Sequence, residues 1–159
     1  MKPLILGIGN ILLSDEGVGA RIVQELEKLK NITPHFDLLD GGTSGMELLD
    51  EMAGREHIIV IDAVLADKQP GDIIVLNDEE VPAMFGRKIS PHQLGLSDVL
   101  SALKLTDEYP RHLCLIGIQP ESLDSHIGLT QTIQNRLPAI LDCLQQQLRR
   151  LGLPAIIFE

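Results

Sequence analysis

Two acidic residues, Asp15 and Glu16, lie inside a glycine-rich turn where a nucleotide-binding protein would hold phosphate. A dinucleotide site needs the spacing Gly-x-Gly-x-x-Gly, with backbone N–H groups and a helix N-terminus facing the pyrophosphate. This chain has Gly7 and Gly9, but Leu12 occupies the place of the third glycine, and the two carboxylates would repel a phosphate. Carboxylates are hard oxygen ligands for cations. The turn therefore predicts a metal site and disfavours a nucleotide site.

Two further side chains are candidate ligands. Asp62 ends an apolar strand, a common place for an active-site carboxylate in α/β proteins, although a carboxylate there can equally cap the next turn. Glu16, taken alone, is better explained as a helix stabiliser that interacts with the helix dipole. His92 lies just inside a helix begun by Ser90 and Pro91, where the dipole favours a neutral imidazole, but a lone histidine is more often an ordinary surface or packed residue. Two carboxylates and an imidazole suit nickel, zinc or manganese.

The elements that must position these residues alternate along the chain. Strand-sized apolar runs followed by amphipathic helices predict an α/β fold, a three-layer sandwich in which a five-stranded, mixed but mostly parallel, twisted sheet is flanked by helices. The expected strands are 3–8, 36–40, 57–61, 72–76 and 113–118. The expected helices begin at Val18, run from Ser44 to about Ala53, begin at Ser90, and run from about Thr130 to Arg150 with Pro138 kinking or dividing the last.

The order of these elements predicts where the candidate ligands meet. The first strand leads to Glu16, the second to Gly41 and Gly42, and the third to Asp62. Because the carboxyl ends of parallel strands share one edge, a central order 2-1-3 would place Glu16 and Asp62 at the topological switch point. Asp15 is expected to support the start of the helix through the dipole, or to be a hydrogen-bond partner behind the metal ligands.

Three connections carry expectations of their own. The fourth strand follows the third after too few residues for a parallel crossover, so it should run antiparallel to the third if the two are neighbours. The long stretch 77–90 is a candidate functional loop, suited to form a wall of a substrate cleft. Ser44 and Glu47 have the spacing of a capping box.

Length and charge narrow the class of protein. The 159 residues predict a single domain, 1–159, and the net charge of −10 disfavours a nucleic-acid partner. The apolar runs are too short to span a membrane, and no secretory signal is evident. Cys114 and Cys143 form no metal or disulfide pattern and are expected to be small buried residues. We therefore expect a cytoplasmic protein with no membrane partner.

Five stretches, in register along the chain, resemble the nickel–iron hydrogenase maturation endopeptidases. They are 7–19 (GIGNILLSDEGVG), 40–45 (DGGTSG), 62–63 (DA), 90–93 (SPHQ) and 119–121 (QPE). The resemblance extends over nearly the whole length. It looks most like the branch that serves hydrogenases of the hydrogenase-2 type, on the strength of 89–96 (ISPHQLGL) and 120–123 (PESL).

The resemblance implies a cytoplasmic, aspartyl-type endopeptidase. Its substrate would be the hydrogenase large-subunit precursor, from which it removes a C-terminal extension after nickel insertion. The metal-binding and catalytic residues of the family carry over to Glu16, Asp62 and His92. The nickel would be carried by the substrate, with zinc, cadmium or manganese able to substitute in the site.

The resemblance also implies where the precursor is recognised. The family's recognition loop carries over to Gly41, Gly42 and Thr43. Two other functions stay open from the residues. One is a non-proteolytic, metal-binding maturation chaperone for the same precursor. The other is a nucleotide-dependent enzyme, which Leu12 and the acidic pair disfavour.

Overall fold

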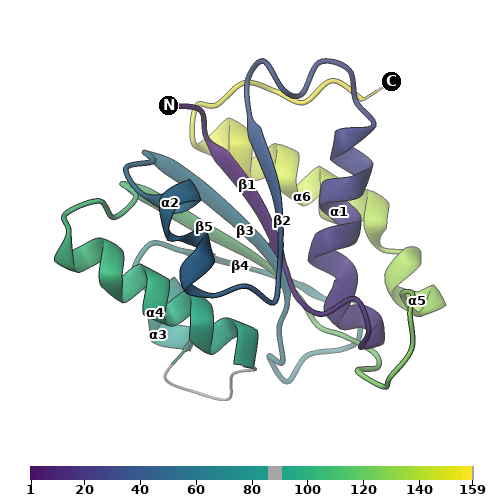
Figure 1. Ribbon diagram of the computed structural model, residues 1–159. Coiled ribbons are helices and arrows are strands. Elements are labelled where there is room, and N and C mark those ends of the chain that lie inside the picture. The colour runs from purple at the N-terminus through teal and green to yellow at the C-terminus, as the bar shows by residue number, and fades with distance from the viewer. Residues whose placement is uncertain (86–90, 159) are drawn as a thin grey trace.

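The structure is a computed structural model that describes residues 1–85 and 91–158, with Pro91 and His92 described by their backbone only. A five-stranded sheet lies between two layers of helices (Figure 1). The strands are β1 (Leu4–Ile8), β2 (Asp37–Gly42), β3 (His57–Ala63), β4 (Ile73–Asn77) and β5 (His112–Ile118). The helices are η1 (Ser14–Gly17), α1 (Val18–Glu27), η2 (Met46–Leu48), α2 (Leu49–Met52), α3 (Glu80–Met84), α4 (Pro91–Leu105), α5 (Gln131–Gln134) and α6 (Leu137–Arg150). Among these helices, none is long and apolar enough to cross a membrane.

The strand order is β2-β1-β3-β5-β4, with every neighbouring pair parallel except β5 and β4. The predicted fold class is confirmed, and the sheet has the central order 2-1-3 on which the meeting of Glu16 and Asp62 depended. The fourth strand runs antiparallel to its neighbour, which is β5 and not β3, so the condition set for its direction is not met. The short connection 64–72 excludes a parallel crossover, yet it leaves room for β5 to lie between the two strands.

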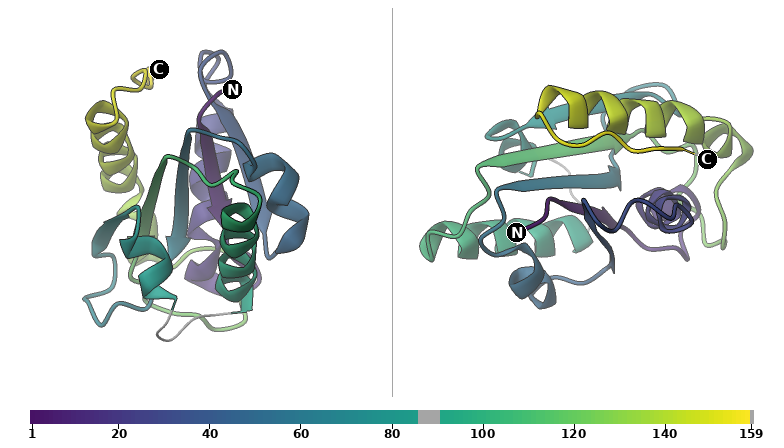
Figure 2. Two further views of the ribbon diagram at one scale, coloured as in Figure 1. Left: turned by 90° about the vertical axis from the view of Figure 1, so that its left-hand side faces the viewer. Right: turned by 90° about the horizontal axis from the view of Figure 1, so that it is seen from above.

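Both faces of the sheet are covered, which explains the almost wholly apolar sequence of β3. Side chains alternate between the faces of a strand. Ile59 and Ile61 therefore join a core with α1 and α6, whereas Ile58 and Val60 join a second core with α2, α3 and α4. Figure 2 shows α6 on one side of the sheet and α4 on the other. The central strands are thus buried, and only their ends reach the surface.

Two expected features of the helices are corrected by the structure. The stretch 77–90 is not simply a loop, because it contains α3; residues 86–90, including the expected N-cap Ser90, lie outside the described residues. The capping box at Ser44 is wrong: no side chain caps the start of η2, and the Glu47 carboxylate accepts a hydrogen bond from the N–H of Gly45 at 2.9 Å. The chain therefore enters this segment through a 3-10 turn before α2.

The C-terminal helical stretch is divided, as the proline indicates. α5 ends at Gln134 and α6 begins at Leu137, with Pro138 in its first turn. Proline is tolerated there because the first N–H groups of a helix have no intrahelical partner. Thr130 caps α5 by accepting a hydrogen bond from the N–H of Ile133.

Candidate functional site

The glycines of the first turn bring strand and helix into close contact. A Cβ on Gly7 would lie 2.3 Å from the carbonyl oxygen of Gly19, and one on Gly9 would lie 1.9 Å from the carbonyl oxygen of Glu16. Gly9 also has a φ of 131°, which residues with a side chain rarely adopt. The glycine spacing that resembles a phosphate-binding loop is therefore required by packing between β1, η1 and α1.

Glu16 is held at the carboxyl edge of the sheet by this turn. Its side chain is largely buried, and its Oε1 accepts a hydrogen bond from the N–H of Asn10 at 3.2 Å. η1 packs against β3. Three residues after Glu16, a Cβ on Gly19 would lie 2.3 Å from the carbonyl oxygen of Ile61, the residue before Asp62. The structure thus places the Glu16 turn directly against the end of β3 that carries Asp62.

Asp62 is almost completely buried, with 1% of its surface exposed. Its Oδ2 accepts a hydrogen bond from the side-chain amide of Gln93 at 2.8 Å. Gln93 is not among the candidate ligands that the sequence indicates. The available signal was its position, since it directly follows His92 in the first turn of a helix that begins at the carboxyl edge of the sheet.

His92 is the second residue of α4, but its side chain lies outside the described residues. Its placement beside Glu16 and Asp62 therefore stays a prediction. Within the part of the chain that the structure describes, no group of three or more His, Cys, Asp or Glu is arranged to hold a metal. The donor chemistry fits a divalent cation if His92 joins the two buried carboxylates, because carboxylate and imidazole ligands together suit borderline metals.

The predicted recognition loop lies next to the Glu16 turn. Gly42 ends β2, and its carbonyl accepts a hydrogen bond from the N–H of Gly9 at 2.8 Å. Thr43 follows and is exposed. A pocket of about 300 Å³ separates this loop from the first turn. Its lining residues are Gly9, Asn10, Ile11, Leu12, Asp40, Gly42 and Thr43, whereas Gly41 is buried behind them.

Asp15 does more than support a helix start, which corrects the expectation from the sequence. Its buried carboxylate accepts hydrogen bonds from the N–H groups of Glu121 (2.9 Å), Ser122 (3.1 Å) and Thr130 (2.8 Å), and from the Thr130 hydroxyl. Asp15 therefore ties the connection between β5 and α5 to the first turn. Since these partners lie more than a hundred residues further along the chain, no local pattern predicts them.

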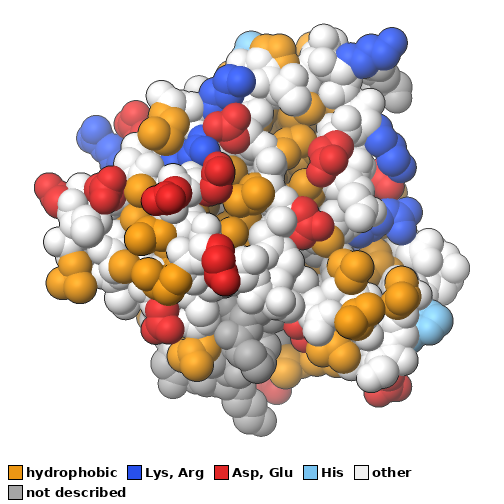
Figure 3. Space-filling model, in the orientation of Figure 1, with side chains coloured by type: hydrophobic (Ala, Val, Ile, Leu, Met, Phe, Trp, Pro, Cys, Tyr) orange, Lys and Arg blue, Asp and Glu red, His pale blue; other side chains and the backbone are white. Residues whose placement is uncertain are grey.

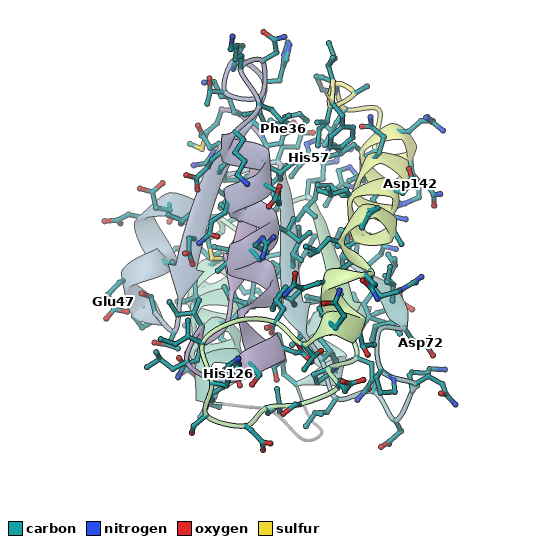
Figure 4. The ribbon with its side chains drawn as sticks, turned by 90° about the vertical axis from the view of Figure 1, so that its right-hand side faces the viewer. Phe36, Glu47, His57, Asp72, His126 and Asp142 are labelled. Carbon is teal, nitrogen blue, oxygen red and sulfur yellow. The ribbon has the colours of Figure 1, made fainter. Side chains whose placement is uncertain are left out.

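A second set of bonds reinforces this tie. Ser14, with a φ of 52°, donates its hydroxyl to the carbonyl of Asp124 at 2.7 Å, and its N–H donates to the carbonyl of His126 at 2.8 Å. Figure 4 shows His126 at the opposite end of the sheet from His57. Exposed hydrophobic side chains lie over the connection from β1 to η1 and the connection from β5 to α5, which these bonds join (Figure 3, below α1). They include Ile11, Leu12 and Ile127.

The cysteines are not candidates for a nucleophile. Burial raises the pKa of the Cys114 thiol to about 12, and burial also raises that of Cys143. A thiol with a raised pKa forms little thiolate at neutral pH. Both cysteines are free.

The fold and its buried carboxylates define an α/β protein with a site at the carboxyl edge of its sheet. The family model described as hydrogenase maturation protease matches residues 20–147, a range that includes Asp62 and His92 and begins after Glu16. The hydrogenase 2 maturation protease of Escherichia coli (strain K12) is 52% identical over 98% of this chain and 96% of that protein. The hydrogenase expression/formation protein HupD of Rhizobium leguminosarum bv. viciae is 40% identical over 95% of this chain and 76% of that protein.

Solved structures agree with this relationship. The hydrogenase maturating endopeptidase HybD from Escherichia coli superposes with a TM-score of 0.89 at 51% identity, over 98% of this chain and 97% of that chain. The [NiFe] hydrogenase maturation protease HybD from Thermococcus kodakarensis gives 0.76 at 27% identity, over 92% and 99%. The chain therefore belongs to the hydrogenase maturation protease family. It is a hydrolase, an endopeptidase of hydrogenase maturation.

Proposed function

We propose that this endopeptidase removes the C-terminal extension of the [NiFe] hydrogenase large-subunit precursor, in the cytoplasm, after nickel has been inserted. The observation that carries the proposal is the buried Asp62 at the end of β3, which accepts a hydrogen bond from the first turn of α4 and lies on the strand against which the Glu16 turn packs. These are the elements from which the three proposed ligands, Glu16, Asp62 and His92, come. The solved relative from Thermococcus kodakarensis is a [NiFe] hydrogenase maturation protease, which supports a [NiFe] hydrogenase precursor as the substrate.

The proposed chemistry uses the precursor's own nickel as part of the substrate. Glu16, Asp62 and His92 bind that ion beside the scissile bond, so that only a nickel-loaded precursor is correctly oriented. The cation supplies Lewis-acid chemistry that polarises the scissile carbonyl. One of the two carboxylates accepts a proton from the attacking water and delivers it to the leaving amide nitrogen. Zinc, cadmium or manganese would fill the same donor set in the absence of nickel.

Recognition of the precursor is assigned to the loop after β2. Gly41, Gly42 and Thr43 lie beside the Glu16 turn, and the pocket between them opens at the same edge of the sheet. We propose that this loop contacts the folded precursor near the cleavage point.

The proposal is tested by incubating the purified protein with nickel-loaded and nickel-free precursor and weighing the products by mass spectrometry. Only the nickel-loaded precursor should lose its extension. Alanine at Glu16, Asp62 or His92 should abolish cleavage, whereas His35→Ala, an exposed histidine outside the site, should not. Equal cleavage of both precursors would exclude nickel sensing. Binding of the precursor without any change in its mass would favour a chaperone.

A further inference from the structure

The side-chain amide of Gln93 joins α4 to the end of β3. Its Nε2 donates to Asp62 Oδ2 at 2.8 Å and to the carbonyl oxygen of Ala63 at 3.2 Å. Gln93 itself is 5% exposed. Because a backbone carbonyl can only accept, the amide turns its nitrogen toward Ala63 and Asp62. Both N–H groups of the amide are used within the site.

The bond to Oδ2 restricts the carboxylate of Asp62, and the bond to the Ala63 carbonyl holds the amide in place. A buried carboxylate needs donors to offset the loss of water. A donor on Oδ2 prevents rotation of the carboxylate, so the direction of Oδ1 is fixed as well. An amide does this without a positive charge, whereas an arginine or lysine would neutralise the aspartate.

The same turn of α4 has a second anchor. A Cβ on Gly95 would lie 3.1 Å from the Cα of Gly45, in the connection that follows the proposed recognition loop. The first turn of α4 is thus held against β3 through Gln93 and against this connection through Gly95. His92 belongs to that turn and directly precedes Gln93.

We propose that Gln93 is a positioning residue. It fixes both the carboxylate of Asp62 and the first turn of α4, so that Asp62 and His92 can bind the same cation. This inference rests on the proposed function, because it takes Asp62 and His92 as ligands. In this role Gln93 acts through its hydrogen bond to Asp62 and is not itself a ligand of the cation. Residues that orient metal ligands in this way commonly change metal affinity by about 10- to 100-fold when they are replaced.

Nickel binding to the metal-free protein, measured by isothermal titration calorimetry with Ni²⁺, tests the role directly. Gln93→Met keeps the length of the side chain and removes both donors, and it should weaken Ni²⁺ binding by about 10- to 100-fold. Gln145→Met is the matched control, since Gln145 makes two hydrogen bonds to Ile156 from α6. The control should lose a similar amount of stability and keep the Ni²⁺ affinity of the wild type.

Kinetics separate positioning from general loosening of the fold. With nickel-loaded precursor, Gln93→Met should lower kcat/KM by about the factor by which it weakens Ni²⁺ binding, because the bound nickel belongs to the substrate, whereas Gln145→Met should keep kcat/KM near the wild-type value. Should Gln93→Met not fold, as judged by circular dichroism, Gln93→Asn replaces it. Its amide is one carbon shorter and cannot reach both acceptors, so the same direction of change is expected.

Asp62→Ala distinguishes failure of this inference from failure of the proposed function. If Asp62→Ala binds Ni²⁺ weakly and the Gln93 variant binds it like the wild type, the positioning role of Gln93 is overturned, but the role of Asp62 as a metal ligand is supported. If both variants bind Ni²⁺ like the wild type, Asp62 is not a metal ligand, and the positioning role of Gln93 is refuted as well. Weak binding by both, with the Gln145 control unchanged, supports the role.

Discussion

The tie made by Asp15 gives a stability prediction that can be worked out atom by atom. Asp15→Asn keeps the shape of the side chain but replaces one carboxylate oxygen by an NH₂ group. In the native protein, Oδ1 accepts from the N–H of Thr130, and Oδ2 accepts from the N–H groups of Glu121 and Ser122. Whichever way the amide lies, its NH₂ group faces at least one backbone N–H that has lost its acceptor. The substitution therefore cannot be accommodated by a simple flip.

The magnitude follows from the number of groups left without partners. One unsatisfied buried N–H costs about 1–3 kcal/mol, and the remaining bonds lose the added strength of an ionised acceptor. We expect Asp15→Asn to lower the free energy of unfolding by about 3 kcal/mol, a large part of the roughly 5–15 kcal/mol typical of a folded domain.

Urea unfolding at pH 7, followed by circular dichroism because the chain has no tryptophan, measures this loss. With an m-value of about 2 kcal/mol/M, the midpoint should fall by about 1.5 M. Asp124→Asn is the control: its side chain is exposed in the same connection, and the change should stay within about 0.5 kcal/mol. A midpoint for Asp15→Asn that coincides with the wild type would refute the reasoning.

Two further predictions concern titrating groups away from the site. Burial, followed by the charge of the neighbouring His112, lowers the pKa of His57 below its ordinary 6.5. The unfolded chain then binds more protons than the native protein near this pH, so stability should fall as the pH drops through 6.5. His57→Gln should remove that part of the loss, as measured by urea unfolding at pH 7.5 and 5.5; an identical loss in both proteins would contradict it. The Cys114 thiol, with its pKa raised to about 12, should resist iodoacetamide at pH 8 in the native protein and react after unfolding in urea. Mass spectrometry of the labelled peptides reads this out, and labelling of native Cys114 at the unfolded rate would show that the thiol is not protected.

The glycine pattern of the first turn shows how one sequence signal serves two different sites. In a dinucleotide-binding protein the glycines allow the backbone to approach a pyrophosphate. Here Gly7 and Gly19 allow β1 and α1 to approach each other, and Gly9 makes room for the carbonyl of Glu16. The result is a strand-to-helix turn that carries a carboxylate where a phosphate would otherwise bind.

The sequence alone determined the five strands and the edge at which their carboxyl ends meet, but not the short helix α3. Its apolar periodicity defined all five strands, because a strand buried on both faces and a half-exposed helix differ in period. The short connection between β3 and β4 predicted an antiparallel fourth strand only as a neighbour of β3, a condition that the structure does not meet. Glu16 and Asp62 could be placed at one edge because parallel strands share their carboxyl ends.

Only the tertiary structure decided which distant residues complete that edge. The pairing of β4 with β5, the hydrogen bonds from Thr130 to Asp15, and the bond from Gln93 to Asp62 all join segments far apart in sequence. Local preferences of the chain carry no information about such partners, since an aspartate in a first helical turn looks the same whether it faces water or three backbone N–H groups. The sequence therefore supplied the acidic residues, and the packing of the fold gave Asp15 and Asp62 different roles.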